Sequence, residues 1–170
     1  MNGQTYEAAK NRAVGYYEKA GIILTSFEKN NIEVADFGLN DLELTGLQIV
    51  TYINTERVCA KEMVLFPKQT CPEHRHIGTK QIPGKEETFR CRFGRVYLYV
   101  EGVGTEKHQS PPKGVYTVFH EIILNPGEQY TIYPDTKHWF QAGPEGAVIS
   151  EFSTKSTDET DIFTDERIIR

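Results

Sequence analysis

The sequence predicts an all-β domain, either a sandwich or a small barrel, with one helix before it. From Leu42 onward, short segments alternate apolar and polar residues and are rich in β-branched and aromatic side chains, which favour strands. Turns rich in Gly, Pro, Asn and Asp separate these segments at close intervals. A chain of 170 residues can bury a full core. We therefore expect one domain over 1–170, with a helix within 1–20, a β-barrel over 32–153 and a tail over 154–170.

The segment 5–20 is predicted to be a helix. Apolar residues recur along it at helical spacing, Thr5 can cap its start, and Gly21 can end it. We expect this helix to lie across a sheet or along a subunit interface. The polar segment 28–31 is interpreted as a loop.

The rest of the chain is expected to form strands joined by turns, apart from a polar loop at 101–114. We expect the His-x-His motif at residues 74–76 to lie at the start of a strand and residue 87 to begin the next one. Segment 143–146 is interpreted as a turn between two separate strands, and the tail is expected to pack over the domain. The expected strands are 32–37, 44–53, 57–66, 90–100, 115–124, 129–134, 138–142 and 147–153.

Four residues form a candidate metal site. His74 and His76 are two residues apart, so on a strand their side chains point to the same side. Glu87 begins the next alternating segment, and we expect a hairpin to return it beside the histidines. His138 stands in a similar strand context. Three imidazoles and a carboxylate form a donor set that suits a first-row divalent metal.

The composition excludes several classes of function. A net charge of −5 disfavours nucleic acid and anionic membranes as partners. No apolar segment approaches the length of a membrane span, and the first residues do not have the pattern of a signal peptide. The three cysteines, Cys59, Cys71 and Cys91, are an odd number without metal-site spacing. We therefore expect small buried thiols in a reducing cytoplasm.

The candidate metal residues also resemble a known pattern. His74-x-His76, Glu87 with Gly94 after it, and the segment 127–138 resemble the two cupin motifs. The gap between His76 and Glu87 is longer than usual, and the Pro-x-Gly that normally precedes the last histidine is absent. Both departures fall in loops, and all four ligand positions are intact.

Longer blocks at 62–67, 70–76, 87–92, 136–143 and 161–165 together resemble the small cupin-type D-lyxose ketol-isomerases over nearly the whole chain. This resemblance implies a cupin-type double-stranded β-helix, a jelly-roll barrel, after the N-terminal helix. It also implies a cytoplasmic, homodimeric, Mn²⁺-dependent aldose–ketose isomerase. Such enzymes interconvert D-lyxose with D-xylulose and D-mannose with D-fructose. The ligand set alone leaves Co²⁺, Fe²⁺, Ni²⁺ and Zn²⁺ open.

An isomerase of this kind needs a base near C1 and C2 of the sugar. Glu151 lies on the last predicted strand and is our first candidate for this base if its face points inward. The alternatives are an outward, solvated Glu151, or Glu87 acting as the base after leaving the metal. Lys61 and Lys85 are candidates for a cation near the developing negative charge, with a solvated surface lysine as the alternative for each.

Four further residues are expected to contact the sugar. Tyr133, Trp139 and Phe140 are predicted to line the pocket, with a purely structural core role as the alternative. Asp161 lies in a tail block that matches the family and could hold a distal hydroxyl group. Two other functions use the same ligands: an Fe(II) cupin dioxygenase and a non-catalytic sugar-binding cupin. A direct hydride shift is the mechanistic alternative to proton transfer.

Overall fold

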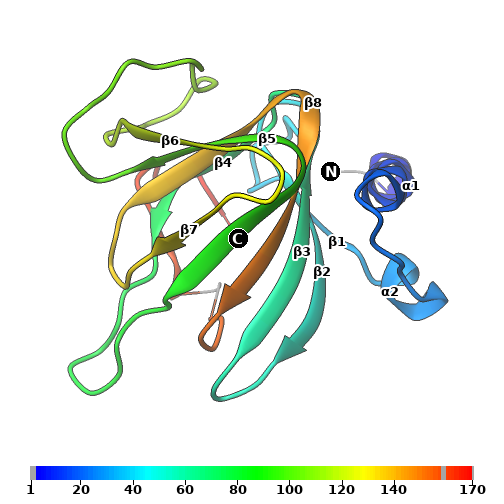
Figure 1. Cartoon of the computed structure of the whole chain (residues 1–170), viewed down its shortest axis with the longest axis horizontal. Coiled ribbons are helices and arrows are strands. Elements are labelled where there is room, and N and C mark those ends of the chain that lie inside the picture. The colour runs from blue at the N-terminus through cyan, green and yellow to red at the C-terminus, as the bar shows by residue number, and fades with distance from the viewer. Residues whose placement is uncertain (1–2, 158–159, 170) are drawn as a thin grey trace.

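The chain forms a curled antiparallel sheet with two helices on its outside (Figure 1). The computed structural model describes residues 3–157 and 160–169. Residues 1–2 of the expected helical segment, and residues 158–159 and 170 of the expected tail, lie outside the described residues. The elements are α1 (Gly3–Lys19), α2 (Ser26–Asn30), β1 (Glu33–Ala35), β2 (Leu47–Asn54), β3 (Cys59–Leu65), β4 (Thr70–Arg75), β5 (Glu87–Val100), β6 (His120–Leu124), β7 (Gln129–Ile132), β8 (His138–Ser153) and β9 (Ile162–Phe163).

The two longest strands, β5 and β8, join the two halves of the barrel. They pair antiparallel along their whole length, from Glu87 opposite Ser153 to Val100 opposite His138. In one half, β8 continues to β3, β2 and β1, and β5 continues to β7. In the other half, β8 continues to β4 and β9, and β5 continues to β6. The predicted all-β barrel with an N-terminal helix is confirmed.

A tight crossing of two glycines lets these long strands bend from one half into the other. The pairing register of β5 and β8 shifts on either side of Gly94, which has φ +70°. A Cβ at Gly94 would lie 2.0 Å from the carbonyl oxygen of Gly146, so this position requires glycine. The prediction of a turn at 143–146 is therefore wrong, because β8 runs through these residues as one strand.

The core fills the space inside the curled sheet. Alternate residues of β5 point into it. The inward-facing residues are odd-numbered up to Cys91 and even-numbered from Val96, because a bulge lies between them. The inward residues of β5 are Phe89, Cys91, Val96, Leu98 and Val100, all buried. Together with apolar residues of β2, β3 and β8, they hold the polar cavity residues on rigid strands, which is the best support for a functional site.

Helix α1 packs on the outer face of the sheet, where its buried residues join Val50 of β2 and Val64 of β3 in one apolar cluster, and α2 lies beside α1 (Figure 1). Helix α1 ends as predicted at Gly21, where the Ile22 N–H reaches back to the Tyr17 carbonyl. The buried Tyr17 hydroxyl donates to backbone oxygens of β2 and β3. The prediction that Thr5 caps the helix is wrong, because helix α1 already includes Gly3 and Gln4.

The prediction of a loop at 28–31 is also wrong. This segment belongs mostly to α2, which a capping box starts: the Thr25 hydroxyl accepts the Glu28 N–H, and the Glu28 carboxylate accepts the Thr25 N–H. The capping signal was present in the sequence, but the helix is only five residues long and has no apolar stripe.

Two expectations about strand pairing need correction. His74 and His76 lie at the end of β4 rather than at its start. Strands β4 and β5 do not form a hairpin, because β4 pairs with β8 and β9 while β5 pairs with β6, β7 and β8. Glu87 therefore approaches the histidines across the barrel interior. The tail packs over the domain as expected, since its strand β9 pairs with β4.

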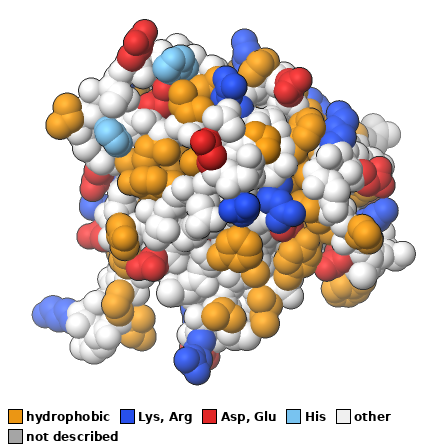
Figure 2. Space-filling view, viewed as in Figure 1, with side chains coloured by type: hydrophobic (Ala, Val, Ile, Leu, Met, Phe, Trp, Pro, Cys, Tyr) orange, Lys and Arg blue, Asp and Glu red, His pale blue; other side chains and the backbone are white. Residues whose placement is uncertain are grey.

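The three thiols are buried, as expected. Cys59, Cys71 and Cys91 are free and buried. Acidic and basic side chains are interspersed on the face shown in Figure 2. Within the described residues, the helices are too short or too polar to cross a membrane.

Candidate metal centre and catalytic cavity

A small cavity lies inside the barrel, with about 20 Å³ of free volume. This is room for about one water molecule. The cavity wall consists of one set of apolar residues and one set of polar residues. The apolar residues are Leu47, Met63, Cys71, Phe89 and Phe140, and the polar residues are Lys61, His74, His76, Lys85, Glu87, Glu151 and Asp161.

Three histidines meet beside this cavity, and two of them, His74 and His76, line it. His74 near the end of β4 and His138 at the start of β8 are direct cross-strand neighbours, and His76 follows just after β4. The three imidazoles each offer a nitrogen within 4.8 Å of the others. All three residues are buried. Burial, together with the neighbouring His138 and His76, lowers the pKa of His74 well below its ordinary value, which keeps it in the neutral form that binds metals.

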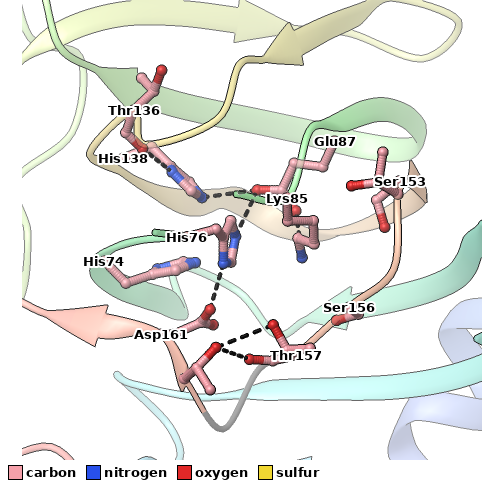
Figure 3. Close-up of polar contacts among 12 residues, drawn as sticks. His74, His76, Lys85, Glu87, Thr136, His138, Ser153, Ser156, Thr157 and Asp161 are labelled. Carbon is pink, nitrogen blue, oxygen red and sulfur yellow. Dashed lines mark hydrogen bonds and ion pairs between the residues drawn. The ribbon is translucent and has the colours of Figure 1, made fainter. Parts of the chain in front are cut away.

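Each histidine is oriented through its Nδ1 atom. His74 Nδ1 lies 2.8 Å from the carbonyl oxygen of Pro72, and His138 Nδ1 lies 2.9 Å from that of Thr136. His76 Nδ1 lies 2.5 Å from a carboxylate oxygen of Asp161. With these acceptors the Nδ1 atoms carry the protons, so the Nε2 atoms are free to bind a metal. Figure 3 shows the three rings converging beside Glu87 and Asp161.

Glu87, the first residue of β5, faces the same point. One of its oxygens lies 3.1 Å from His76 Nε2 and 3.0 Å from His138 Nε2. The other lies 2.7 Å from Lys85 Nζ. Burial tends to raise the pKa of Glu87, but the charges of Lys85 and His76 outweigh it and hold this pKa well below its ordinary value. Glu87 is thus an ionised carboxylate in position to be the fourth ligand, a role that stays a prediction.

The residues fit a divalent cation. His138 Nε2 is buried and makes no hydrogen bond of normal geometry within the described structure, although Glu87 is near. Burial tends to lower the pKa of His76, but the Glu87 charge and hydrogen bonds with Asp161 and Glu87 raise it to about 9. The surroundings therefore favour positive charge at this point. Three imidazoles and a carboxylate suit first-row divalent metals.

A second charged group lies beside the metal candidates. Glu151 is buried and faces inward, directly opposite Lys61 on β3. One oxygen of Glu151 lies 3.1 Å from Lys85 Nζ and 4.0 Å from Lys61 Nζ, and it accepts a hydrogen bond from Ser153. Lys61 also donates to Ser156 at 2.8 Å. The alternatives of a solvated Glu151 and of solvated lysines are therefore wrong.

The aromatic predictions are correct for one residue of three. Phe140 lines the cavity. Trp139 is adjacent on the strand and points to the other face, where it stacks on Tyr99 and donates to the Val118 carbonyl. Tyr133 is 66% exposed and is not among the cavity residues. The prediction that Trp139 and Tyr133 line the pocket is wrong, and strand alternation from His138 could have excluded Trp139.

Asp161 belongs to the site, and its carboxylate lies against His76 Nδ1. Sequence reasoning also missed Met63 and Phe89 in the cavity wall. Strand alternation could have found both, because each lies two residues from a predicted site residue on the same strand. It could not have found Leu47 or Ser156, whose positions depend on the barrel closure and the tail.

Two curated relatives match almost the whole chain. The D-lyxose/D-mannose isomerase of Thermosediminibacter oceani is 65% identical over 171 residues, which cover 98% of this chain and 90% of that protein. The D-lyxose ketol-isomerase of Cohnella laeviribosi is 59% identical and covers 100% of this chain and 96% of its own. No protein-family model matches the chain.

Among solved structures, the L-ribose isomerase of Acinetobacter sp. DL28 in complex with L-ribose superposes with a TM-score of 0.77. The alignment covers 99% of this chain and 94% of that one at 16% identity. At this identity the likeness concerns the fold alone, and it confirms the cupin-type double-stranded β-helix.

Proposed function

Because the chain belongs to the family of D-lyxose ketol-isomerases, which are aldose–ketose isomerases, we propose that it interconverts D-lyxose and D-xylulose. D-Mannose and D-fructose are the second proposed pair, as the name of the Thermosediminibacter relative suggests. The observation that carries the proposal is a three-histidine group, two of whose members line the cavity, in the same cavity as a separate buried carboxylate between two lysines.

The metal is proposed to be Mn²⁺, held by His74, His76, Glu87 and His138. The burial of all four residues and the orientation of the three rings support this assignment. A divalent cation in this position would polarise the sugar carbonyl and make the hydrogen on the neighbouring carbon more acidic. The identity of the metal rests on the family resemblance.

Glu151 is proposed as the base that moves the proton between C2 and C1. In the direction from aldose to ketose, its carboxylate takes the C2 proton, the electrons of that bond form a C1–C2 double bond, and the electrons of the C1–O1 double bond move onto O1. The hydroxyl proton of O2 passes to O1, a C2–O2 double bond forms, and the electrons of the C1–C2 double bond take the proton back from Glu151 at C1. Burial of Glu151 keeps water away from the transferred proton. Glu87 is the alternative base, and a hydride shift is the alternative mechanism.

Lys61 and Lys85 are proposed to offset negative charge during this transfer. Both are buried in the cavity wall, and both approach Glu151. When Glu151 takes a proton and loses its charge, the two ammonium groups are left to stabilise the negative charge that develops on the sugar oxygens. Phe140 is proposed to contact an apolar face of the sugar, since it lines the same cavity.

The substrate assignment is tested with metal-stripped protein. Mn²⁺ is added back, and D-lyxose, D-mannose, D-xylose and L-ribose are offered in parallel while ketose is measured. We expect ketose formation that depends on the metal and is fastest with D-lyxose. If no sugar gives ketose although Mn²⁺ binds, the isomerase proposal is wrong. Oxygen uptake with Fe²⁺ and sugar binding without turnover then test the dioxygenase and the non-catalytic cupin, neither of which the relatives support.

The base is tested with Glu151→Gln, which keeps the size of the side chain and removes its basicity. We expect the variant to bind Mn²⁺ like the wild type and to lose turnover by at least about a hundredfold. As a second measurement, the wild type is run in deuterated water: deuterium at C1 of the ketose supports proton transfer through a base, because a hydride shift incorporates none. Retained activity in the variant would exclude Glu151 as the base and favour Glu87 or a hydride shift.

We also propose that the protein is a cytoplasmic homodimer, as the family resemblance implies. Three buried thiols without a disulfide are compatible with a reducing compartment. Light scattering at micromolar concentration tests the dimer, and a mass equal to one chain would contradict it.

A further inference from the structure

The three metal-site histidines are not held in equal ways. His74 and His138 each use a backbone carbonyl two residues earlier in the chain as the partner of Nδ1. His76 instead uses the carboxylate of Asp161, which is 85 residues further along the chain. Of the three, it is therefore the one whose orientation depends on a distant segment.

Strand β9 places Asp161 next to His76. It pairs with the very strand that carries the histidines, with Phe163 opposite His74. The ring of Phe163 also packs against the His74 imidazole, with 5.4 Å between ring centroids. The tail thus contacts two of the three histidines, one through a hydrogen bond and one through an aromatic ring (Figure 3 shows Asp161 below His76).

The residues after Asp161 are anchored by polar contacts. The Thr164 N–H donates to the Glu73 carbonyl at 3.0 Å, and the Thr164 hydroxyl donates to the Glu73 carboxylate at 2.6 Å. Further along, the Ile169 N–H donates to the Phe37 carbonyl at 3.1 Å. The described tail residues 160–169 are therefore a docked part of the barrel, and Asp161 is held in a defined position.

A carboxylate that accepts the Nδ1 proton changes the properties of the imidazole as a metal ligand through Nε2. It fixes the tautomer with the proton on Nδ1, holds the plane of the ring, and makes Nε2 a more basic ligand than a carbonyl partner does. The side chain of Asp161 is 5% exposed, so little water competes for this hydrogen bond. Loss of such a partner typically weakens metal binding by about 10–100-fold.

We propose that Asp161 is a positioning residue of the metal centre, which sets metal affinity by orienting His76. By this proposal the C-terminal tail is a required part of the metal site, and the side chain of Asp161 does not need to touch the sugar. The proposal rests on the proposed function in one respect, because it assumes that a divalent metal binds at the three histidines.

The test measures Mn²⁺ affinity by equilibrium dialysis of metal-stripped protein, without sugar. We expect Asp161→Ala to weaken binding by about 10–100-fold. Asp161→Asn should fall between Ala and the wild type, because its amide oxygen still accepts the Nδ1 proton but carries no charge. Glu166→Gln is the matched control: it removes an exposed carboxylate from the same tail, and its affinity should stay within about twofold of the wild type.

A double-mutant cycle shows whether Asp161 acts through His76. Zn²⁺ is used here because it binds such sites more tightly than Mn²⁺, so the weakened variants can still be titrated. In the His76→Ala background, Asp161→Ala should change the affinity by less than about twofold, since the ring that it orients is gone. An undiminished effect in that background would refute the positioning role.

The remaining outcomes separate this proposal from the proposed function. If the wild type binds no metal, the metal site itself is wrong. If the wild type binds Mn²⁺ and a folded Asp161→Ala binds it equally well, the positioning role is wrong while the metal site stands. Unchanged metal affinity with a raised KM for D-lyxose would also overturn the proposal and would restore Asp161 as a sugar contact. Should Asp161→Ala fail to fold, Asp161→Asn carries the same comparison.

Discussion

Glu73 offers the clearest stability prediction. It precedes the candidate metal ligand His74 in the chain, and on a strand neighbouring side chains point to opposite faces. Its side chain is fully buried. One carboxylate oxygen accepts the backbone N–H groups of Thr117 at 2.6 Å and Val118 at 3.0 Å. The other accepts the hydroxyls of Thr117 at 2.8 Å and Thr164 at 2.6 Å. Through these hydrogen bonds, Glu73 connects β4 to the segment before β6 and to the C-terminal tail.

The cost of Glu73→Ala follows from these four donors. The two threonine hydroxyls can rotate to other acceptors, but the two backbone N–H groups cannot. A buried donor left without a partner costs about 1–3 kcal/mol, so we expect a loss of about 3–5 kcal/mol in the free energy of unfolding. Glu73→Gln should lose only about 1–2 kcal/mol. Its oxygen can still accept the two N–H groups, and its NH₂ group can donate to the hydroxyls, which also accept.

Urea denaturation of the metal-free protein, followed by circular dichroism, measures both variants. Glu166→Ala is the control, since it removes an exposed carboxylate from the tail and should change stability by less than about 0.5 kcal/mol. The reasoning fails if Glu73→Ala costs no more than this control, or if Gln and Ala cost the same. The second result would mean that volume, and not hydrogen bonding, is what Glu73 supplies.

Three further predictions concern the outer face of β8, a buried acid and the metal. Trp139→Phe loses the 2.8 Å hydrogen bond to Val118 and should cost about 1–2 kcal/mol in urea denaturation with KM for D-lyxose unchanged; a raised KM would contradict its position outside the cavity. Burial raises the pKa of Glu62 above 4.5, only partly offset by the Ser150 hydrogen bond and by Arg92. The folded state therefore holds this proton more tightly than the unfolded state, and stability should fall as the pH rises above 4.5. Glu62→Gln should reduce this loss of stability with rising pH. If thermal melts of the variant and the wild type show the same dependence of stability on pH, Glu62 is not the group responsible. Mn²⁺ at about 100 times its Kd should add about 2.7 kcal/mol, seen as a higher Tm that EDTA reverses, and His74→Ala should abolish this shift.

The three histidines of the candidate metal site could be predicted from the sequence, because their placement depends mostly on local strand geometry. His74 and His76 share a face through strand alternation, and their rings do meet, with 4.9 Å between centroids. His138 followed from its strand context and from the cupin resemblance. The pairing that unites them, with His74 directly opposite His138, was not predictable, because register between strands far apart in sequence is set by the closure of the whole barrel.

The errors in the predicted secondary structure also have physical causes. The Gly143-Pro144-Glu145-Gly146 segment has the composition of a turn, yet it continues a strand because Gly146 crosses Gly94 at close range. A sequence pattern reports local preference, whereas this bend is a property of two strands together. Helix α2 was missed for the opposite reason. Its signal is one capping box at Thr25, without the apolar stripe on which helix prediction mainly depends.

The charges of the cavity show how one fold can keep two carboxylates for two tasks. Glu87 and Glu151 lie on different strands, and Lys85 contacts both, at 2.7 Å and 3.1 Å. Glu87 is also flanked by two imidazoles, a position that suits the proposed role of metal ligand. Glu151 faces Lys61 instead. The shared lysine keeps the two negative charges from repelling each other in a buried space.

Lys85→Met should therefore disturb both carboxylates at once and reduce Mn²⁺ affinity and turnover together. Lys61→Met should lower turnover more than Mn²⁺ affinity, since the Lys61 ammonium group lies 4.0 Å from Glu151 and donates to Ser156. Equal effects of the two substitutions on Mn²⁺ affinity would show that this division between the carboxylates is wrong.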